Sequence, residues 1–317
     1  MLHLRLIVPA DATDKVVRLL ETTVGTAHLA VLTGAARDPA GDVVMCDVAR
    51  EAGDELIGAL RDMGIDKSGS ITVENMDLTL SAHADRAEKA APGEGADAVL
   101  WAELTEATHE ESTFSVTYVA FLAVATMLAA CGVMLDNAIL IVGAMAVGPE
   151  FGPLAGISTA LVRRSPHLVW RALWTLIAGF AIAMVVTAGF AWLMDAFGLF
   201  TRSMVEGDRP NTAFIWKPDW MSFVVAFLAG IAGTLSLTSA KSGALIGVAI
   251  SVTTVPAAAN AAVAFSYSDY TQTIGSTQQL LANLGGIVLA GTLTLLVQKG
   301  LWALHRRSET AVRRPPV

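Results

Sequence analysis

The chain has 317 residues, of which 54% are hydrophobic and only 16% are charged, and its mean hydropathy is +0.56. A soluble domain has about 25% charged residues, so this composition excludes a wholly soluble protein and predicts helices embedded in lipid. Residues 1–113 carry 9 Lys and Arg against 21 Asp and Glu, a net charge of −12, whereas residues 114–317 carry 12 against 8, a net of +4. The acidic half is expected to be soluble, and its charge argues against a nucleic-acid partner.

Cysteine usage and the N-terminus restrict the compartment. Cys46 and Cys131 have no metal-ligand spacing around them, so neither a disulfide framework nor a metal site is expected. The segment MLHLRLIVPADATDK has too short an apolar run for a signal peptide and lacks a small-residue cleavage pattern. We therefore expect the acidic half to stay in the cytoplasm.

Residues 1–80 are predicted to form a compact α+β domain. LHLRLIV alternates apolar and polar residues as a half-buried strand does, and KVVRLLETTVG has the apolar stripe of a helix. A hairpin of AHLAVLT and DVVMCDV, a helix over 51–63 and a strand over 70–80 complete the order β-α-β-β-α-β, which is ferredoxin-like. This shape resembles small ligand-binding regulatory domains. A plain structural or oligomerising domain fits equally well, since fold does not imply function.

Residues 81–113 are predicted to connect this domain to the membrane. The Ala, Gly, Pro and charged residues of 81–98 are typical of a linker, and WAELTEATHEES over 101–112 is predicted to be an acidic helix. Its carboxylates and His109 suggest a metal site. A solvated face is the favoured interpretation, because runs of charge on a helix usually face water.

Residues 114–303 are predicted to hold six membrane spans, followed by a basic cytoplasmic tail over 304–317. The spans are 114–134, 138–162, 168–194, 220–239, 242–265 and 280–301. Lys and Arg are concentrated in the loops after the second and fourth spans and in the tail, so all three are expected on the cytoplasmic side. The longer loop over 195–219, in which Arg202, Arg209 and Lys217 are mixed with acids, is expected outside. This predicts a multi-pass protein of the inner (plasma) membrane with both termini in the cytoplasm.

The second span is interrupted by Gly148-Pro149-Glu150-Phe151-Gly152-Pro153. Proline removes a backbone donor and glycine loosens the helix, so polar backbone groups are left without intrahelical partners. Irregular backbone at membrane depth is tolerated only where protein buries it or where it lines a wet cavity. We therefore predict a broken helix with a site at its centre.

An internal repeat is suggested by aligning the first two spans with the fourth and fifth. Both units run from Phe-Leu-Ala through a small-residue helix to an apolar run interrupted by proline, so that Gly143 corresponds to Gly247 and Pro153 to Pro256. Because each unit has three spans, repeats over 114–194 and 220–303 would be inverted, an arrangement that points to a transporter site near the midplane. Chance similarity is the alternative, since small residues match easily.

Glu150 is the strongest candidate functional residue, because an acid deep in hydrocarbon is costly and marks an ion path, a proton relay or a substrate contact. The alternative is a capping role at the start of the second half-helix. The predicted site for a substrate or ion consists of Gly148, Pro149, Glu150, Gly152, Pro153, Thr253, Thr254, Pro256, Asn260 and Asn283. For the hydroxyl groups, helix packing is a strong alternative.

These motifs resemble one known family. The segment from Glu111 to Leu161 with its VGAM…GPxxGPL pattern, and the later GTLSLTSAKSGALIGVAISVTTVP and LLANLGGIVLA, are similar to the "domain of unknown function 389" (DUF389) family of prokaryotic membrane proteins. The sequence departs from the family at Thr254-Val255-Pro256-Ala257, where a double proline is expected. The resemblance implies a fold and an expectation of transport or sensing, without a substrate.

The expected fold is therefore an α-helical polytopic membrane protein with an N-terminal ferredoxin-like domain. No nucleophile elbow, phosphate loop or paired catalytic acids occur in the sequence, so neither an enzyme nor a cofactor is expected. The leading function is a transporter or channel-like permease for a small solute or ion, in contact with the bilayer and forming a homo-oligomer. The alternative is a membrane-embedded sensor or assembly scaffold whose soluble domain binds a small ligand.

Overall fold

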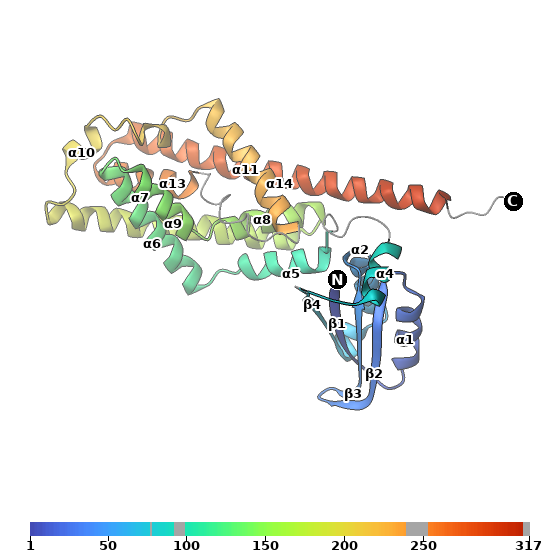
Figure 1. Ribbon diagram of the computed structural model, residues 1–317. Coiled ribbons are helices and arrows are strands. Elements are labelled where there is room, and N and C mark those ends of the chain that lie inside the picture. Colours follow the sequence, from blue (N-terminus) through green and yellow to red (C-terminus); the bar gives the residue numbers. More distant parts are fainter. Residues whose placement is uncertain (77, 92–98, 239–252, 313–317) are drawn as a thin grey trace. The chain divides into compact units, whose positions relative to one another are not determined.

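The computed structural model describes residues 1–76, 78–91, 99–238 and 253–312 (Figure 1). The chain divides into two compact units. The first comprises Met1–Leu104 and Gln298–Val317, and the second comprises Thr105–Val297.

The first unit contains a four-stranded antiparallel sheet in the order β2-β3-β1-β4. Its elements are β1 (Leu2–Val8), α1 (Thr13–Thr22), β2 (Thr26–Arg37), β3 (Ala40–Val48), α2 (Arg50–Asp62), the short α3 (Ile65–Ser68) and β4 (Ser70–Asn75). Strand β1 lies inside the sheet, where Leu4 pairs with Cys46 on one side and Val73 on the other. The expected β-α-β-β-α-β order is present, with α3 as an additional turn.

The core of this unit follows from the alternation in β1. Leu2, Leu4, Leu6 and Val8 are fully buried, as expected for one face of a strand. The helices contribute the facing apolar side chains, which are Val16, Leu20, Leu56 and Leu60. Burying a side chain of this kind stabilises a fold by about 1.5–3 kcal/mol.

The segment predicted as a linker contains a helix, α4 (Ala82–Ala90). The Ser81 hydroxyl accepts hydrogen bonds from the backbone N–H groups of His83 and Ala84, so a serine N-cap starts an alanine-rich helix. Leu100 is also buried and belongs to the core of the sheet. The predicted linker residues 92–98 lie outside the described residues. The sheet unit therefore gains a helix and a core residue from beyond residue 80.

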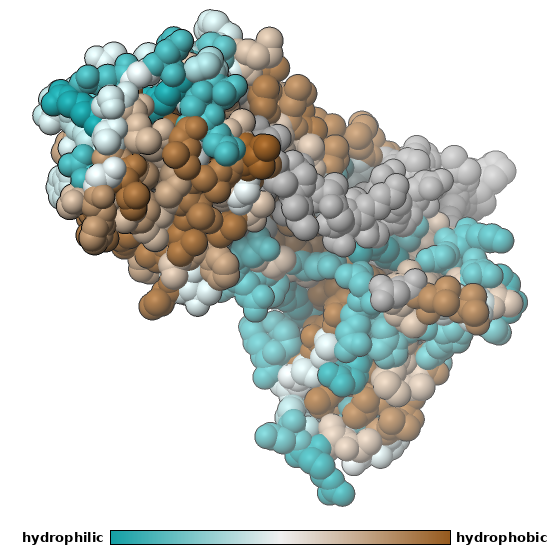
Figure 2. Space-filling view, turned by 60° about the vertical axis from the view of Figure 1, so that its left-hand side comes forward, coloured by the Kyte–Doolittle hydropathy of each residue, from teal (hydrophilic) through white to brown (hydrophobic). Residues whose placement is uncertain are grey.

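The second unit is helical. The acidic helix α5 (Trp101–Glu111) leads into it, and the chain continues through α6 (Val116–Met134), α7 (Ala138–Val147), α8 (Phe151–Val162), α9 (Pro166–Ala196), α10 (Arg202–Glu206), α11 (Trp220–Thr238), α13 (Thr254–Ser266) and α14 (Tyr270–Val312). Within the described residues, α6, α9, α11 and the Tyr270–Trp302 part of α14 are long and apolar enough to cross a membrane. Apolar side chains gather on the surface of this unit (Figure 2), where Trp170 and Val185 are 68% and 73% exposed. This is the surface expected of a membrane protein.

The prediction of six spans stays a prediction. The second predicted span corresponds to α7 and α8, with residues 148–150 between them outside any helix. The fifth overlaps α13, but its first part, including Gly247, lies outside the described residues.

Hydrogen bonds tie the segment after α6 to a later loop, and the segment after α13 to the last turn of α9. After α6, Asp136 accepts hydrogen bonds from Asn211 and Thr212 in the segment that follows α9. Burial alone raises the pKa of Asp136, but these donors outweigh it and lower the pKa below its ordinary value. Tyr267, which follows α13, donates to Asp195 near the end of α9.

Two histidines bind the buried carboxylate of Asp47 in the sheet unit. His3 and His28 each donate through Nδ1 to Asp47, with N···O distances of 2.7 and 2.6 Å. The other nitrogen of His28 lies 2.8 Å from the Ser81 hydroxyl, which caps α4. Burial alone raises the pKa of Asp47, but the two histidines outweigh it and lower the pKa.

A fragment of residues 1–104 is predicted to be soluble and to unfold cooperatively, because it includes Leu100 and α4. A fragment of residues 1–80 should melt at a lower temperature, since losing a buried leucine costs about 2–5 kcal/mol. Thermal unfolding of both fragments, followed by circular dichroism, tests this. Equal midpoints would mean that residues 81–104 do not belong to the folding unit.

Replacement of the shared acceptor, Asp47→Asn, should destabilise the 1–104 fragment by about 1–2 kcal/mol at neutral pH, because two partly buried hydrogen bonds lose their charged acceptor. The folded-state pKa of Asp47 is lowered, so its contribution is full above the unfolded value of about 3.9. It is lost as the pH falls through the folded value. The difference between the wild type and the variant should therefore shrink in acid.

Urea unfolding at a series of pH values measures this difference. Asp11→Asn, at an exposed position of the same domain, is the control and should leave stability nearly unchanged. A difference between wild type and Asp47→Asn that stays constant into acid would contradict the role given to the carboxylate.

Candidate functional site

The N-terminal ends of two helices of the second unit, α8 and α13, lie next to each other. Helix α8 begins at Phe151, directly after Glu150, and α13 begins at Thr254. Their third residues are Pro153 and Pro256, which the sequence comparison had paired. Proline is tolerated in a first turn because the N–H that it lacks has no intrahelical partner there. The two predicted proline segments are thus both helix starts.

Glu150 lies between these two starts and is 5% exposed. Its side chain makes no capping hydrogen bond to α8, so the capping role considered from sequence does not occur. Instead its Oε1 accepts a hydrogen bond of 2.6 Å from the Thr254 hydroxyl of α13. Its Oε2 is buried and has no hydrogen-bond partner among the described residues. One oxygen of the carboxylate therefore joins the two helix starts, and the other has no partner among the described residues.

Gly148 makes room for this carboxylate. A Cβ atom at position 148 would lie 2.3 Å from Glu150 Oε2 and 2.8 Å from a methyl group of Val255, so no larger residue fits without displacement. The backbone of Gly148 is extended, with φ −67° and ψ 128°, which any residue can adopt. Glycine is therefore required at this position by close approach and not by conformation.

A second polar contact lies one residue before α13. The Asn283 amide of α14 donates a hydrogen bond of 3.0 Å to the Thr253 hydroxyl. Both residues line a cavity of about 270 Å³ together with Asp219, Ser222 and apolar residues of α11. The structure thus places Thr253 and Asn283 at a cavity wall and Thr254 next to Glu150.

Asn260 belongs to a different polar cluster. Its amide donates to the Ser276 hydroxyl of α14 at 2.7 Å, and its oxygen accepts from Arg209, which lies before α11 and is 6% exposed. Arg209 also donates to Gln272. Burial lowers the pKa of Arg209, although the negative charges of Asp136 and Asp269 act in the opposite direction. The sequence analysis assigned Arg209 to an outside loop and did not predict its burial.

The same analysis missed a buried polar face on α14. Gln272, Ser276, Gln279 and Asn283 follow one another at spacings of four, three and four residues, which places them on one side of a helix. All are at most 7% exposed. Gln279 donates to Asn283, but its Oε1 has no partner among the described residues. The helical spacing of these amides was the signal that could have revealed this face.

The remaining predicted residues lie outside these contacts. At Gly152, an added Cβ would meet Glu111 of α5 at 2.6 Å, so this glycine allows α5 and α8 to approach each other. Pro149 lies between α7 and α8 beside Gly148. In the part of the chain that the structure describes, no group of three His, Cys, Asp or Glu residues is placed to hold a metal ion.

Comparison with known proteins gives a family and one distant relative. The family model described as domain of unknown function (DUF389) matches residues 145–289, which confirms the resemblance found in the sequence. An uncharacterized protein of Methanocaldococcus jannaschii is 27% identical over 135 residues, which are 43% of this chain and 39% of the relative. The match thus spans less than half of either protein. No solved structure matches the chain.

Gly148→Ala is predicted to destabilise the full-length protein, because the new methyl group would meet the Glu150 carboxylate and Val255. Overpacking of this kind costs about 1–3 kcal/mol. Gly143→Ala is the matched control on α7, since a Cβ there meets nothing within 4 Å. Thermal unfolding of both purified variants measures the effect. If Gly148→Ala melted at the same temperature as Gly143→Ala, the tight contact with Glu150 would be wrong.

Proposed function

We propose that this chain, which resembles the DUF389 family over residues 145–289, is a transporter or channel-like permease for a small solute or ion. The observation that supports this most is the buried carboxylate of Glu150, which has one oxygen without a described partner. The comparisons indicate a membrane protein of unknown function, and transport is our proposal.

The chemistry of the site favours a proton or a small cation. A buried carboxylate is costly unless a proton, a cation or hydrogen-bond donors compensate it. Thr254 supplies one donor, and none of the ion pairs between described residues involves Glu150. Another buried side-chain oxygen without a described partner, Oε1 of Gln279, is also an acceptor. Both positions would accept a positive or hydrogen-donating ligand.

The proposed path of the ligand runs along the buried face of α14. At one place on it, Asn283 and Thr253 line the cavity of about 270 Å³ next to the start of α13. Further along, Ser276 connects through Asn260 to Arg209, and Gln272 accepts a hydrogen bond from Arg209 directly. A positive charge at that end would hinder a cation from passing, so Arg209 is suited to act as a barrier there.

A six-span arrangement of two inverted repeats is part of this proposal. It is supported by the matching first turns of α8 and α13. Transporters of this kind build their sites where broken helices from the two halves meet. Both ends of the chain would then lie on the cytoplasmic side.

Glu150→Gln tests the function. Glutamine keeps the size of the side chain and an acceptor for Thr254, so the variant should fold, but it cannot carry a charge or exchange a proton. Flux through proteoliposomes, measured against pH with a panel of small ions and solutes, should be lost or lose its pH dependence. Glu206→Gln, at an exposed carboxylate of α10, is the control and should behave as the wild type does. Unchanged flux in Glu150→Gln would refute the assignment, and absence of flux in the wild type would favour the sensor or scaffold.

A further inference from the structure

The turn between α8 and α9 concentrates positive charge. Arg163 and Arg164 form the turn, and Arg171 lies one and a half helical turns into α9. An apolar neighbour, Trp170, is largely exposed. The three arginines have different surroundings, and these decide what each can bind.

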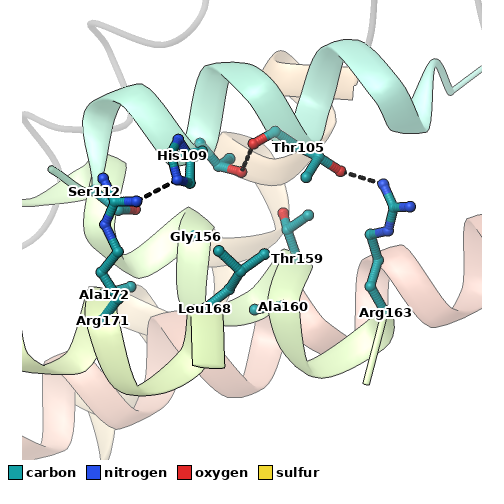
Figure 3. A pocket seen from close by; sticks show the side chains of 11 residues that line it. Thr105, His109, Ser112, Gly156, Thr159, Ala160, Arg163, Leu168, Arg171 and Ala172 are labelled. Carbon is teal, nitrogen blue, oxygen red and sulfur yellow. Dashed lines mark hydrogen bonds between the residues drawn. The ribbon is translucent and has the colours of Figure 1, made fainter. Parts of the chain in front are cut away.

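Two of these arginines hold α5. Figure 3 shows Arg163 and Arg171 reaching α5 at either end of a small pocket. Arg163 donates to the Thr105 hydroxyl, and Arg171 contacts His109 and donates to Thr113 at 2.6 Å. The pocket between them has a volume of about 20 Å³, which is room for roughly one water molecule. It is therefore a packing interface and not a site for a solute.

The third arginine lies on a different cavity. Arg164 and Ser165 line a volume of about 360 Å³ whose other walls are Ala160, Leu161, Pro166, Val169 and Trp170. Arg164 is exposed, and no hydrogen bond or ion pair joins its guanidinium to a residue that the structure describes. Leu161 and Trp170 are 44% and 68% exposed. The cavity thus combines an unpartnered guanidinium with apolar walls open to the outside.

We propose that this cavity binds one anionic phospholipid, with its phosphate on Arg164 and an acyl chain along Leu161, Val169 and Trp170. A guanidinium pairs with phosphate through two parallel hydrogen bonds, and Ser165 adds a hydroxyl beside it. Tryptophan is typical of the depth at which lipid headgroups meet acyl chains. Basic pockets between membrane helices bind lipid headgroups in this way.

The apolar walls distinguish a lipid from a free anion. Five of the seven lining residues are apolar and cannot form hydrogen bonds with inorganic phosphate through their side chains. The same residues can pack against the acyl chain of a lipid. A zwitterionic lipid would fit the walls equally well but would gain less from Arg164, because its headgroup carries its own positive charge. Preference for an anionic headgroup is therefore the property that Arg164 confers.

The experiment uses the purified full-length protein and phosphatidylglycerol with brominated acyl chains, which quench nearby tryptophan fluorescence. The signal of Trp170 is the difference between wild type and Trp170→Phe. Brominated phosphatidylglycerol should quench it at a lower concentration than brominated phosphatidylcholine. Arg164→Gln should weaken the phosphatidylglycerol effect about fivefold, the change expected for one basic residue at an anionic surface, and remove the preference.

Two further variants keep the test interpretable. Arg164→Lys retains the charge and should retain most of the preference, which shows that the position tolerates substitution. Arg202→Gln removes one exposed positive charge from α10 and should leave the preference intact. Equal quenching by both lipids, or an unchanged preference in Arg164→Gln, would overturn the proposal. Displacement of the brominated lipid by inorganic phosphate alone would assign the site to a free anion instead.

Discussion

The helical unit depends on one costly feature, the burial of a carboxylate where two helices begin. Glu150 is 5% exposed, and one of its oxygens receives only the Thr254 hydroxyl. Keeping it there requires a glycine at position 148, where any side chain would strike the carboxylate. A protein that needed only stability could replace this acid with an apolar residue at little cost. Its position at the interruption between α7 and α8 is the observation from which we propose a functional role.

The buried polar groups on α13 and α14 form two hydrogen-bonded clusters, separate from the contact between Glu150 and Thr254. Asn283 holds Thr253 at a cavity wall, and farther along α14 the side chains of Ser276 and Gln272 lead to Asn260 and Arg209. Buried amides and hydroxyls that satisfy one another are rigid and specific, whereas single unsatisfied groups are costly. Glu150 Oε2 and Gln279 Oε1 are among the buried oxygens without a partner in the described residues, and we propose that a ligand binds there.

The arginines at the α8–α9 turn have two roles: Arg163 and Arg171 contact neighbouring residues, and Arg164 is exposed. Arg163 and Arg171 bind Thr105 and Thr113, in and directly after α5. The basic loop from which the membrane orientation was predicted therefore also holds the acidic helix in place. Gly152 and Gly156 of α8 contribute to this contact, because a Cβ at either would strike α5 or Ser112. The carboxylates of α5, which suggested a metal from sequence, are exposed at Glu106 and Glu110. Other residues of the helix, Thr105 and His109, contact the arginines.

The sequence by itself determined the elements that depend on local periodicity. Alternation over Leu2 to Val8 predicted β1 and its buried face, and the apolar runs predicted the long helices α6, α9, α11 and α14, because burial in a sheet or in lipid imposes its period on the residues. The break around Glu150 was equally visible, since proline and glycine act on their own backbone. Only the tertiary structure decided the partners. Thr254 lies 104 positions beyond Glu150, and Arg209 reaches Asn260 from a segment that had been assigned to an outside loop. Such contacts join residues that are distant in the chain, and no local pattern records which side chains the packing of helices will bring together.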